Sequence, residues 1–373
     1  MDFDFTPDQL ELASLTRRIA TDKVTPELLR QVETGPERFD PDIWEALAAA
    51  GILGISLPED IGGGGCGLIE QCIVLEELGR RLAPVPILAS IVLGAAPIAE
   101  FGSAEQRQDW AAPAAAGTKI LTAALSEPAN PEPGTPRTVA VPIPEGYRLE
   151  GVKTSVTAGT FADLVLVPAS VEGTVGVFLV EPTAPGVTVE RQRTSNSETV
   201  ARITLAGVTI PGSSVLGRPE DGPRIVRSMV DHGTAALCAY QLGVLEQALA
   251  DTAEYSKTRT QFGRPIATFQ AVGHRLADSY IATEGARLTL WQAVWRLDVG
   301  LPASTEVEVA KFWAADAGHQ VAHAAVHIHG GMGVANEHTT HRYFVAAKQN
   351  EFMLGGATNQ LLRIGVALAA EPV

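Results

Sequence analysis

The chain has 373 residues, of which 46% are hydrophobic and 19% charged, and its formal net charge is −15. Such a chain can bury a core in about two or three domains, while its acidic surface opposes binding to nucleic acid, which we exclude. No apolar run is long enough to span a membrane, and the acidic start of the chain is unlike a signal or transit peptide, so we expect a cytoplasmic protein.

The first third of the chain predicts helices. The run Thr6–Gln9 is typical of a capping box with proline at the first helical position. A second helix is expected to start after Asp40, and a third after Gly67. From about Lys119 the chain changes to short runs rich in Val, Ile and Thr, separated by Gly, Pro and Asn, which predict an antiparallel β domain. From about Pro223 long periodic segments predict helices again.

These patterns predict an α+β multidomain protein. We expect an N-terminal α-helical domain at residues 1–117, a middle antiparallel β domain at residues 118–222, and a C-terminal domain like a four-helix bundle at residues 223–373.

The octapeptide Arg259–Ile266 gathers chemically useful groups at the end of a predicted helix. Arg259 offers a planar donor fork for phosphate oxygens, Phe262 offers a stacking face, and Gly263 allows close backbone approach. Together with the amide of Gln261, these groups indicate a site for a diphosphate joined to a flat heterocycle. A solvated helix end with a glycine cap would explain Gly263 but not the rest of the run.

A second glycine-rich run, His329–Gly333, follows later in the chain. Its glycines would let backbone N–H groups approach a ligand, although a helix cap with a tight turn is the simpler explanation when the run is taken alone. The run strengthens the dinucleotide interpretation because it accompanies the octapeptide.

Three other patterns carry less weight. Gly62, Gly64 and Gly67 fit G-x-G-x-x-G, but no buried strand precedes them, so a flexible turn is favoured over a dinucleotide fingerprint. His319, His323 and His327 share a helix face, yet no cysteine or carboxylate completes a set of ligands, so we predict helix-packing histidines and no metal site. The cysteines are too few and too scattered for a disulfide framework or a zinc site.

The motifs, in this order, resemble those of the acyl-CoA dehydrogenase family. Arg-x-Gln-Phe-Gly-x-Pro-Ile, then Phe269-Gln270, then His-Gly-Gly-x-Gly are similar to its C-terminal helical domain. Pro58–Gly63 is similar to its Pro-Glu-x-x-Gly-Gly turn, and Leu125–Pro128 to the start of its flavin-facing loop. The resemblance covers essentially the whole chain. It implies the acyl-CoA dehydrogenase fold, FAD, an acyl-CoA substrate, an electron-transfer acceptor and a tetramer built as a dimer of dimers.

The resemblance also implies roles for individual residues. In the family, FAD lies across a dimer interface, and the neighbouring subunit holds the pyrophosphate and adenine. The positions that match these motifs would therefore serve a partner's FAD, and they are Arg259, Gln261, Phe262, Gly330 and Gly331. His327, which stands where many members have glutamine, joins these candidate cofactor-binding residues.

The chain departs from the family at the catalytic base. The reaction removes an α-proton with a glutamate while a β-hydride goes to the flavin. One family position for this glutamate falls in Phe352–Thr358 and the other at Gly233, and neither carries a carboxylate. We therefore expect no catalytic residue in this chain, with Asp231 and Glu351 as the candidates for a displaced base.

The residues expected beside the flavin ring are altered as well. Ala129–Gly134 replaces a Gly-Ala-Gly-Ser-Asp-like loop, and Ser155–Ala158 replaces a Trp-Ile-Thr-Asn segment. The chain thus resembles the non-catalytic subunit of bacterial α2β2 enzymes that oxidise CoA thioesters of sterol side chains. Our leading hypothesis is a subunit, inactive alone, that completes the FAD site of a catalytic sibling. The alternatives are a self-sufficient homotetrameric dehydrogenase with a displaced base, and a structural module without flavin.

Overall fold

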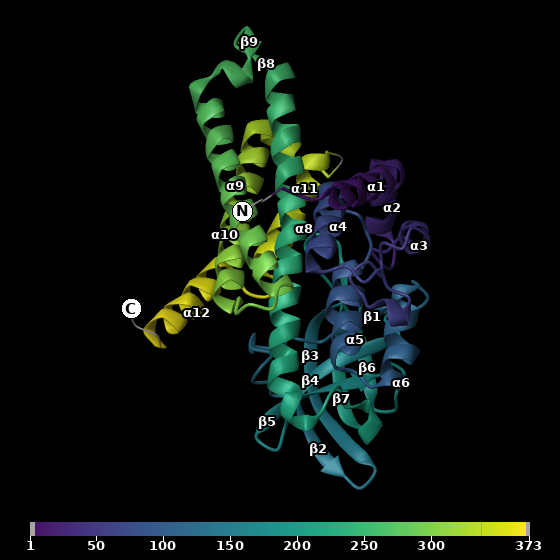
Figure 1. Ribbon diagram of the computed structural model, residues 1–373. Coiled ribbons are helices and arrows are strands. Elements are labelled where there is room, and N and C mark those ends of the chain that lie inside the picture. The colour runs from purple at the N-terminus through teal and green to yellow at the C-terminus, as the bar shows by residue number, and fades with distance from the viewer. Residues whose placement is uncertain (1–3, 337, 371–373) are drawn as a thin grey trace. The chain divides into compact units, whose positions relative to one another are not determined.

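The computed structural model describes residues 4–336 and 338–370 (Figure 1). The chain divides into two compact units, each assembled from separate segments. The helical unit comprises residues up to 29, 68–83 and 234 onward, and the β unit comprises residues 30–67 and 84–233. The predicted fold class, with helices at both ends and a β domain between them, is confirmed, whereas the predicted domain boundaries stay a prediction.

The β unit is built on a seven-stranded sheet with the order β1-β4-β2-β3-β7-β6, in which β5 also pairs with β4. Its strands are β1 (Leu121–Ala123), β2 (Val139–Ile143), β3 (Gly146–Thr157), β4 (Leu164–Val171), β5 (Thr174–Val180), β6 (Val187–Arg193) and β7 (Thr199–Pro211). Most pairings are antiparallel, as expected, but β1 and β2 pair with β4 in parallel. Parallel strands need a long connection between them, and the connection from β1 to β4 contains the β2–β3 hairpin.

Alternating apolar residues of these strands form the core of the β unit. Leu149, Val167, Phe178 and Ile203 are fully or almost fully buried in one cluster. The register Leu149↔Val208 places two of its apolar side chains directly opposite each other on neighbouring strands.

Short helices complete the β unit: α3 (Pro41–Ala49), α5 (Ala96–Phe101), α6 (Ala104–Gln106) and α7 (Ala112–Ala115), with 3₁₀ turns at Glu59–Ile61, Gly212–Ser214 and Pro219–Asp221. Wider π-helical turns at Leu88–Ala95 and Arg107–Ala111 run directly into helices that carry Pro97 and Pro113. Proline has no N–H for the usual helical bond and its ring clashes with the carbonyl four residues back, so widening of the preceding turn accommodates it.

The helical unit contains α1 (Pro7–Lys23), α4 (Leu68–Arg81), most of α8 (Gly222–Thr258), α9 (Gln270–Asp298), α10 (Ser304–His329), α11 (Thr339–Phe352) and α12 (Ala357–Ala370). The helix α2 (Pro26–Thr34) begins at the end of its first segment. The predicted capping box is confirmed, since Gln9 N bonds Thr6 Oγ1 at 3.3 Å and Thr6 N bonds Gln9 Oε1 at 2.9 Å. In the other unit, Asp40 caps α3 through Ile43 N at 2.8 Å.

Two glycines bring α4 and α8 almost into backbone contact. A Cβ atom on Gly243 would overlap the carbonyl oxygen of Glu76, and one on Gly79 would overlap that of Tyr240. Only glycine fits such a close crossing. The crossing places charged side chains of both helices side by side.

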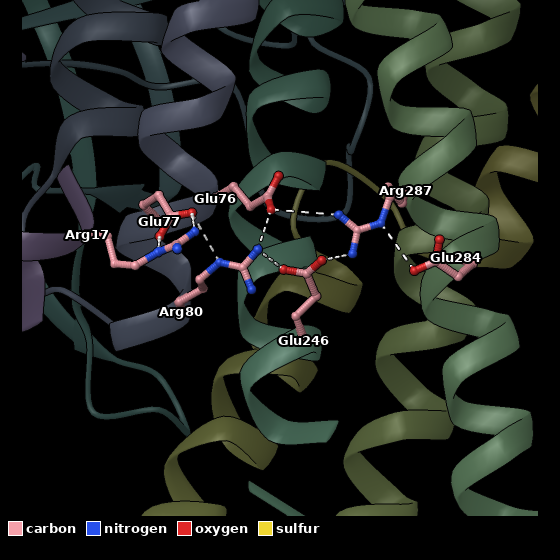
Figure 2. A network of polar contacts seen from close by, with 7 residues as sticks. All are labelled: Arg17, Glu76, Glu77, Arg80, Glu246, Glu284 and Arg287. Atoms are coloured by element: carbon pink, nitrogen blue, oxygen red, sulfur yellow. Dashed lines mark hydrogen bonds and ion pairs between the residues drawn. The ribbon is translucent and has the colours of Figure 1, made fainter. Parts of the chain in front are cut away.

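Those charged side chains form a network within the helical unit (Figure 2). It consists of Arg17, Glu76, Glu77, Arg80, Glu246, Glu284 and Arg287. Arg80 bonds Glu76 at 2.6 Å and also contacts Glu246, which in turn contacts Arg287. Burial raises the pKa of Glu76, although both arginines oppose that shift. The network therefore ties α1, α4, α8 and α9 together through partly desolvated charges.

Within residues 4–336 and 338–370, no helix has both the length and the apolar character that crossing a membrane requires.

Candidate cofactor-binding site

The octapeptide forms a hairpin that projects beyond the end of α8 (Figure 1). Its strands are β8 (Thr260–Gln261) and β9 (Arg264–Pro265). Phe262 and Gly263 make the turn with φ angles of 53° and 77°, the left-handed pair that a type I′ hairpin requires. Glycine adopts this conformation freely, but a residue such as Phe262 costs about 1–2 kcal/mol there. The strained residue nevertheless holds its ring 91% exposed.

The polar groups of the hairpin also face solvent. Arg259 and Gln261 are exposed, and among the described residues no ion pair or hydrogen bond engages the Arg259 guanidinium. The Gln261 amide donates to its neighbour Thr260 O at 2.9 Å. The Arg264 guanidinium is less available, because it lies over the Phe269 ring at 4.2 Å. Arg259 is therefore the hairpin donor best placed to bind phosphate.

The second glycine-rich run begins where α10 ends. Gly330 has φ 64° and ψ −142°, a backbone conformation that only glycine adopts without strain. A side chain on Gly330 or Gly331 would meet nothing within 4 Å, so the backbone here lies open. Gly333 differs, since a Cβ atom there would press on Val326. His327 is exposed on the last turn of α10.

The structure brings these two motifs together. The rings of Tyr255 on α8 and His329 on α10 stack with centroids 4.2 Å apart and planes 20° apart. Tyr255 lies one turn before Arg259, and His329 directly precedes Gly330. The helix ends that carry the two motifs thus meet at this stack. An exposed guanidinium and an open glycine turn are both groups that suit a pyrophosphate. The sequence interpretation missed Tyr255, although its spacing from Arg259 was a usable signal.

The late family position for the base is a tight turn without a carboxylate. Leu354 and Gly355 have φ angles of 58° and 95°, and Gln360 Nε2 donates to their carbonyl oxygens at 3.1 and 3.3 Å. The candidate Glu351 precedes this turn. Its carboxylate accepts from Lys348 Nζ at 2.5 Å, which engages it in an ion pair.

The other family position lies on the part of α8 that belongs to the β unit. Gly233 is buried there, and Asp231 is half-buried. Two residues on a helix differ by about 200° of rotation, so Asp231 does not point where a side chain at Gly233 would. The ring of His232 donates from Nδ1 to Ser228 O at 2.8 Å. Asp231 stays a candidate for a displaced base.

In the β unit, Glu127 joins the segments that precede and follow the altered loop. Its carboxylate accepts from Lys153 Nζ at 2.8 Å, Thr138 Oγ1 at 2.6 Å and Arg137 N at 2.6 Å. Burial acts to raise the pKa of Glu127, but the bonds from Lys153, Thr138 and Arg137 outweigh it and lower the pKa to about 2. The ends of the loop Ala129–Gly134 are therefore anchored by a buried ion pair. Its partners are far apart in sequence, which is why the sequence did not predict it.

Thr157, the retained residue of the ring-side segment, lines a small cavity. The cavity has a volume of about 30 Å³ and also borders Arg38, Phe161 and Glu198. This space holds one or two waters and is too small for a tricyclic ring. Burial raises the pKa of Glu198, and the nearby Arg38 opposes the shift.

The segment Gly35–Phe39, which we call the strap, covers this part of the β unit. Glu37 accepts from Thr160 Oγ1 at 2.8 Å, Pro36 O accepts from Thr199 Oγ1 at 2.9 Å, and Phe39 stacks on Phe161 at 5.3 Å. Side chains of the chain itself thus border this cavity, which is too small for an isoalloxazine ring.

The remaining sequence patterns have structural explanations. The glycine-rich run follows a 3₁₀ turn rather than a strand, and a Cβ atom on Gly63 would overlap the backbone of Leu57. The rings of His319 and His323 stack at 4.2 Å, and Lys348 Nζ lies 3.1 Å from His319, a cation that opposes metal binding. Across the described ranges, no three His, Cys, Asp or Glu side chains gather as metal ligands.

Comparison with known proteins places these features in context. Residues 6–118 match the acyl-CoA dehydrogenase N-terminal domain and residues 220–369 match the C-terminal domain. The acyl-CoA dehydrogenase FadE27 of Mycobacterium tuberculosis is 45% identical over 380 residues, with 100% of both chains covered.

Two solved structures are similar over almost the whole chain. One is a chain of the ChsE4-ChsE5 complex from Mycobacterium tuberculosis, which is 46% identical with a TM-score of 0.95 over 100% of both chains. The other is a variant of the Tcur3481-Tcur3483 steroid acyl-CoA dehydrogenase, 43% identical with a TM-score of 0.91, covering 97% of this chain and 98% of that one.

Proposed function

The chain belongs to the acyl-CoA dehydrogenase family, and we propose that within it this chain is the subunit that completes the FAD site of a catalytic sibling in an α2β2 complex. One observation carries the proposal: the exposed Arg259 and the open Gly330 are retained, whereas both family positions of the base lack a carboxylate. FAD is the cofactor, and when bound it accepts a hydride from the β-carbon of the acyl-CoA.

The chain's own residues would bind and orient rather than react. Arg259 would donate to the pyrophosphate oxygens, and the backbone N–H of Gly331 would donate to the same group, because the Gly330 N–H already donates to His327 O. Phe262 and Gln261 would contact the adenine end, beside His327. We call the hairpin Arg259–Pro265 and the glycines Gly330–Gly331 the two arms of the FAD grip.

Two features of the chain oppose dehydrogenation in a site of its own. A general base contributes about 10²–10⁴-fold to such a reaction, and here Gly233 and Gly355 stand at its positions. The strap also contributes Arg38 to the lining of the small cavity at Thr157, and the buried Glu127–Lys153 pair holds the start of the altered loop. We therefore expect the isolated chain to be inactive, with the sibling supplying the base and the surroundings of the ring.

The substrate class follows from the relatives. The ChsE4-ChsE5 complex and the Tcur3481-Tcur3483 steroid acyl-CoA dehydrogenase pair two different subunits and resemble this chain along its length. These similarities support a CoA thioester of a bulky, sterol-type side chain, oxidised during β-oxidation, as the substrate at the sibling's site. An electron-transfer protein would then accept the electrons from the reduced cofactor.

The test compares the lone chain with the complex. FAD per chain and dehydrogenase activity are measured on both, and we expect FAD and activity only in the complex. Arg259→Ala should weaken FAD binding by about 10- to 100-fold, because a charge-assisted hydrogen bond contributes about 1.5–3 kcal/mol. Lys257→Ala is the matched control, because it removes another cation from the same helix end. Lys257 forms an ion pair with Glu254 at 3.1 Å.

Stoichiometric FAD and turnover in the lone chain would overturn the proposal. In that case Asp231→Asn and Glu351→Gln identify a displaced base, because the true base would be the one whose loss abolishes turnover while FAD stays bound. Unchanged FAD in the Arg259→Ala complex would instead favour a structural subunit.

A further inference from the structure

The end of α8 and the end of α10 are joined by an aromatic stack. The rings of Tyr255 and His329 lie nearly parallel at 4.2 Å. His329 is only 6% exposed, although His327, two residues before it, and Gly330, directly after it, face solvent. The buried His329 ring therefore fixes how the end of α10 lies against Tyr255 at the end of α8.

The orientation of the His329 ring is set by its own helix. Nδ1 donates to Ala325 O at 2.8 Å, because a carbonyl oxygen can only accept. The following turn packs close to the base of this side chain, since a Cβ atom on Gly333 would lie 3.1 Å from His329 Cβ. The imidazole is thus held between its helix, the glycine turn and Tyr255.

Tyr255 is connected to the hairpin in turn. Arg259 N donates to Tyr255 O at 2.9 Å, so the helical hydrogen-bond pattern extends to Arg259. His338, whose Nδ1 accepts from Thr340 N at the start of α11, approaches His329 at 5.1 Å. Three helix ends therefore meet at this imidazole, and the two nearest carry the two arms.

We propose that Tyr255 and His329 are a positioning pair that fixes the spacing between the two arms of the FAD grip. The inference rests on the proposed function, and it assigns a role to two residues that this function does not itself use. A pyrophosphate is bound by Arg259 and by the backbone near Gly330 together, so a change of their separation weakens both sets of hydrogen bonds. The stack resists that change because it links the residues nearest to each arm.

The test uses the assembled complex, with FAD as the probe. FAD is removed and titrated back while flavin fluorescence is followed, and particle size is checked by light scattering. Tyr255→Ala should raise the Kd for FAD about 3- to 10-fold, as expected for loss of an aromatic pair. Tyr255→Phe keeps the stack and should stay within about twofold of the wild type. If Tyr255→Ala does not assemble, Tyr255→Leu keeps apolar volume without a planar ring and should give the same increase.

His323→Ala is the matched control, because it removes an equally close ring stack from the same helix, two turns from the glycines. It should leave the Kd unchanged. An assembled Tyr255→Ala or Tyr255→Leu complex that binds FAD like His323→Ala would overturn the positioning role. Arg259→Ala separates this failure from failure of the proposed function: if that variant also binds FAD normally, the grip itself is wrong.

Discussion

Replacing Glu127 with glutamine tests whether the ion pair anchors the altered loop of the β unit. Glu127 is 6% exposed and Lys153 is fully buried, and the two bond at 2.8 Å. The pKa of Glu127 lies at about 2 instead of 4.5. A shift of this size corresponds to about 3 kcal/mol of stability at neutral pH.

The sign of the pH dependence follows from the lowered pKa. The stability that the ionised Glu127 contributes is complete above the unfolded pKa of 4.5. It is lost as the pH falls through about 2, because only there does the carboxylate of the folded state bind its proton. At pH 3 about half of it remains, or roughly 1.5 kcal/mol. The stability difference between the wild type and Glu127→Gln should therefore narrow from pH 7 to pH 3.

A double-mutant cycle assigns the loss to the pair. Glu127→Gln leaves Lys153 buried without a counter-charge and should cost about 3–5 kcal/mol, whereas Glu127→Gln with Lys153→Met removes both charges and should recover part of this loss. Urea unfolding measures the energies, and hydrogen exchange of residues 126–138 shows whether the loop has been released. The reasoning is refuted if Glu127→Gln lowers the unfolding free energy by less than about 1 kcal/mol and leaves hydrogen exchange unchanged. It is also refuted if the double variant is no more stable than Glu127→Gln alone.

Two further predictions concern the helical unit. Lys311 is buried with its Nζ donating to Asn350 O and Glu351 O, and burial lowers its pKa to about 8. The Lys311 side chain of the unfolded protein keeps its proton up to about pH 10.5. Between pH 8 and 10.5 the unfolding free energy of the wild type should therefore rise by about 3 kcal/mol relative to that of Lys311→Met. Unfolding free energies from urea titrations that change equally with pH in the two proteins would contradict this. Phe262→Asn should relieve about 1 kcal/mol of left-handed strain and so slow amide hydrogen exchange in the hairpin. The same variant should weaken FAD binding by the complex, because it removes the exposed ring. Faster exchange or unchanged FAD binding would count against the prediction.

Local rules predicted the features that depend on neighbouring residues. The capping box at Thr6 and Gln9, the helix start at Asp40 and the succession of helices, strands and helices follow from capping, periodicity and turn chemistry. The motifs at Arg259 and Gly330 were recognisable for the same reason, since each is a short run. Their roles in FAD binding and the cytoplasmic location remain predictions.

Features that join distant segments could not be predicted from the sequence. The parallel pairing of β1 with β4, the Glu127–Lys153 pair and the strap depend on which strands meet, and neither propensity nor spacing encodes that. The Tyr255–His329 stack is intermediate. Each residue lies beside a recognised motif, but only the packing of α8 against α10 shows that the motifs share one neighbourhood.

The hairpin turn and the late family position of the base both have left-handed backbone, but they differ in the residues that adopt it. A left-handed Phe262 costs about 1–2 kcal/mol, and its edge contact with Phe269 at 6.0 Å offsets little of that because the ring stays exposed. Asparagine or glycine would adopt the turn with less strain, and under the proposed function the FAD bound by the complex would offset the strain at Phe262. Gly355 shows the opposite case. With φ at 95° and the Gln360 amide 2.9 Å from the place of a Cβ atom, a side chain there would be strained and would require the amide, which donates to Gly355 O, to shift. The hairpin thus places a strained, exposed phenylalanine where glycine would fit, whereas the turn at the late family position has glycine where a side chain would be strained.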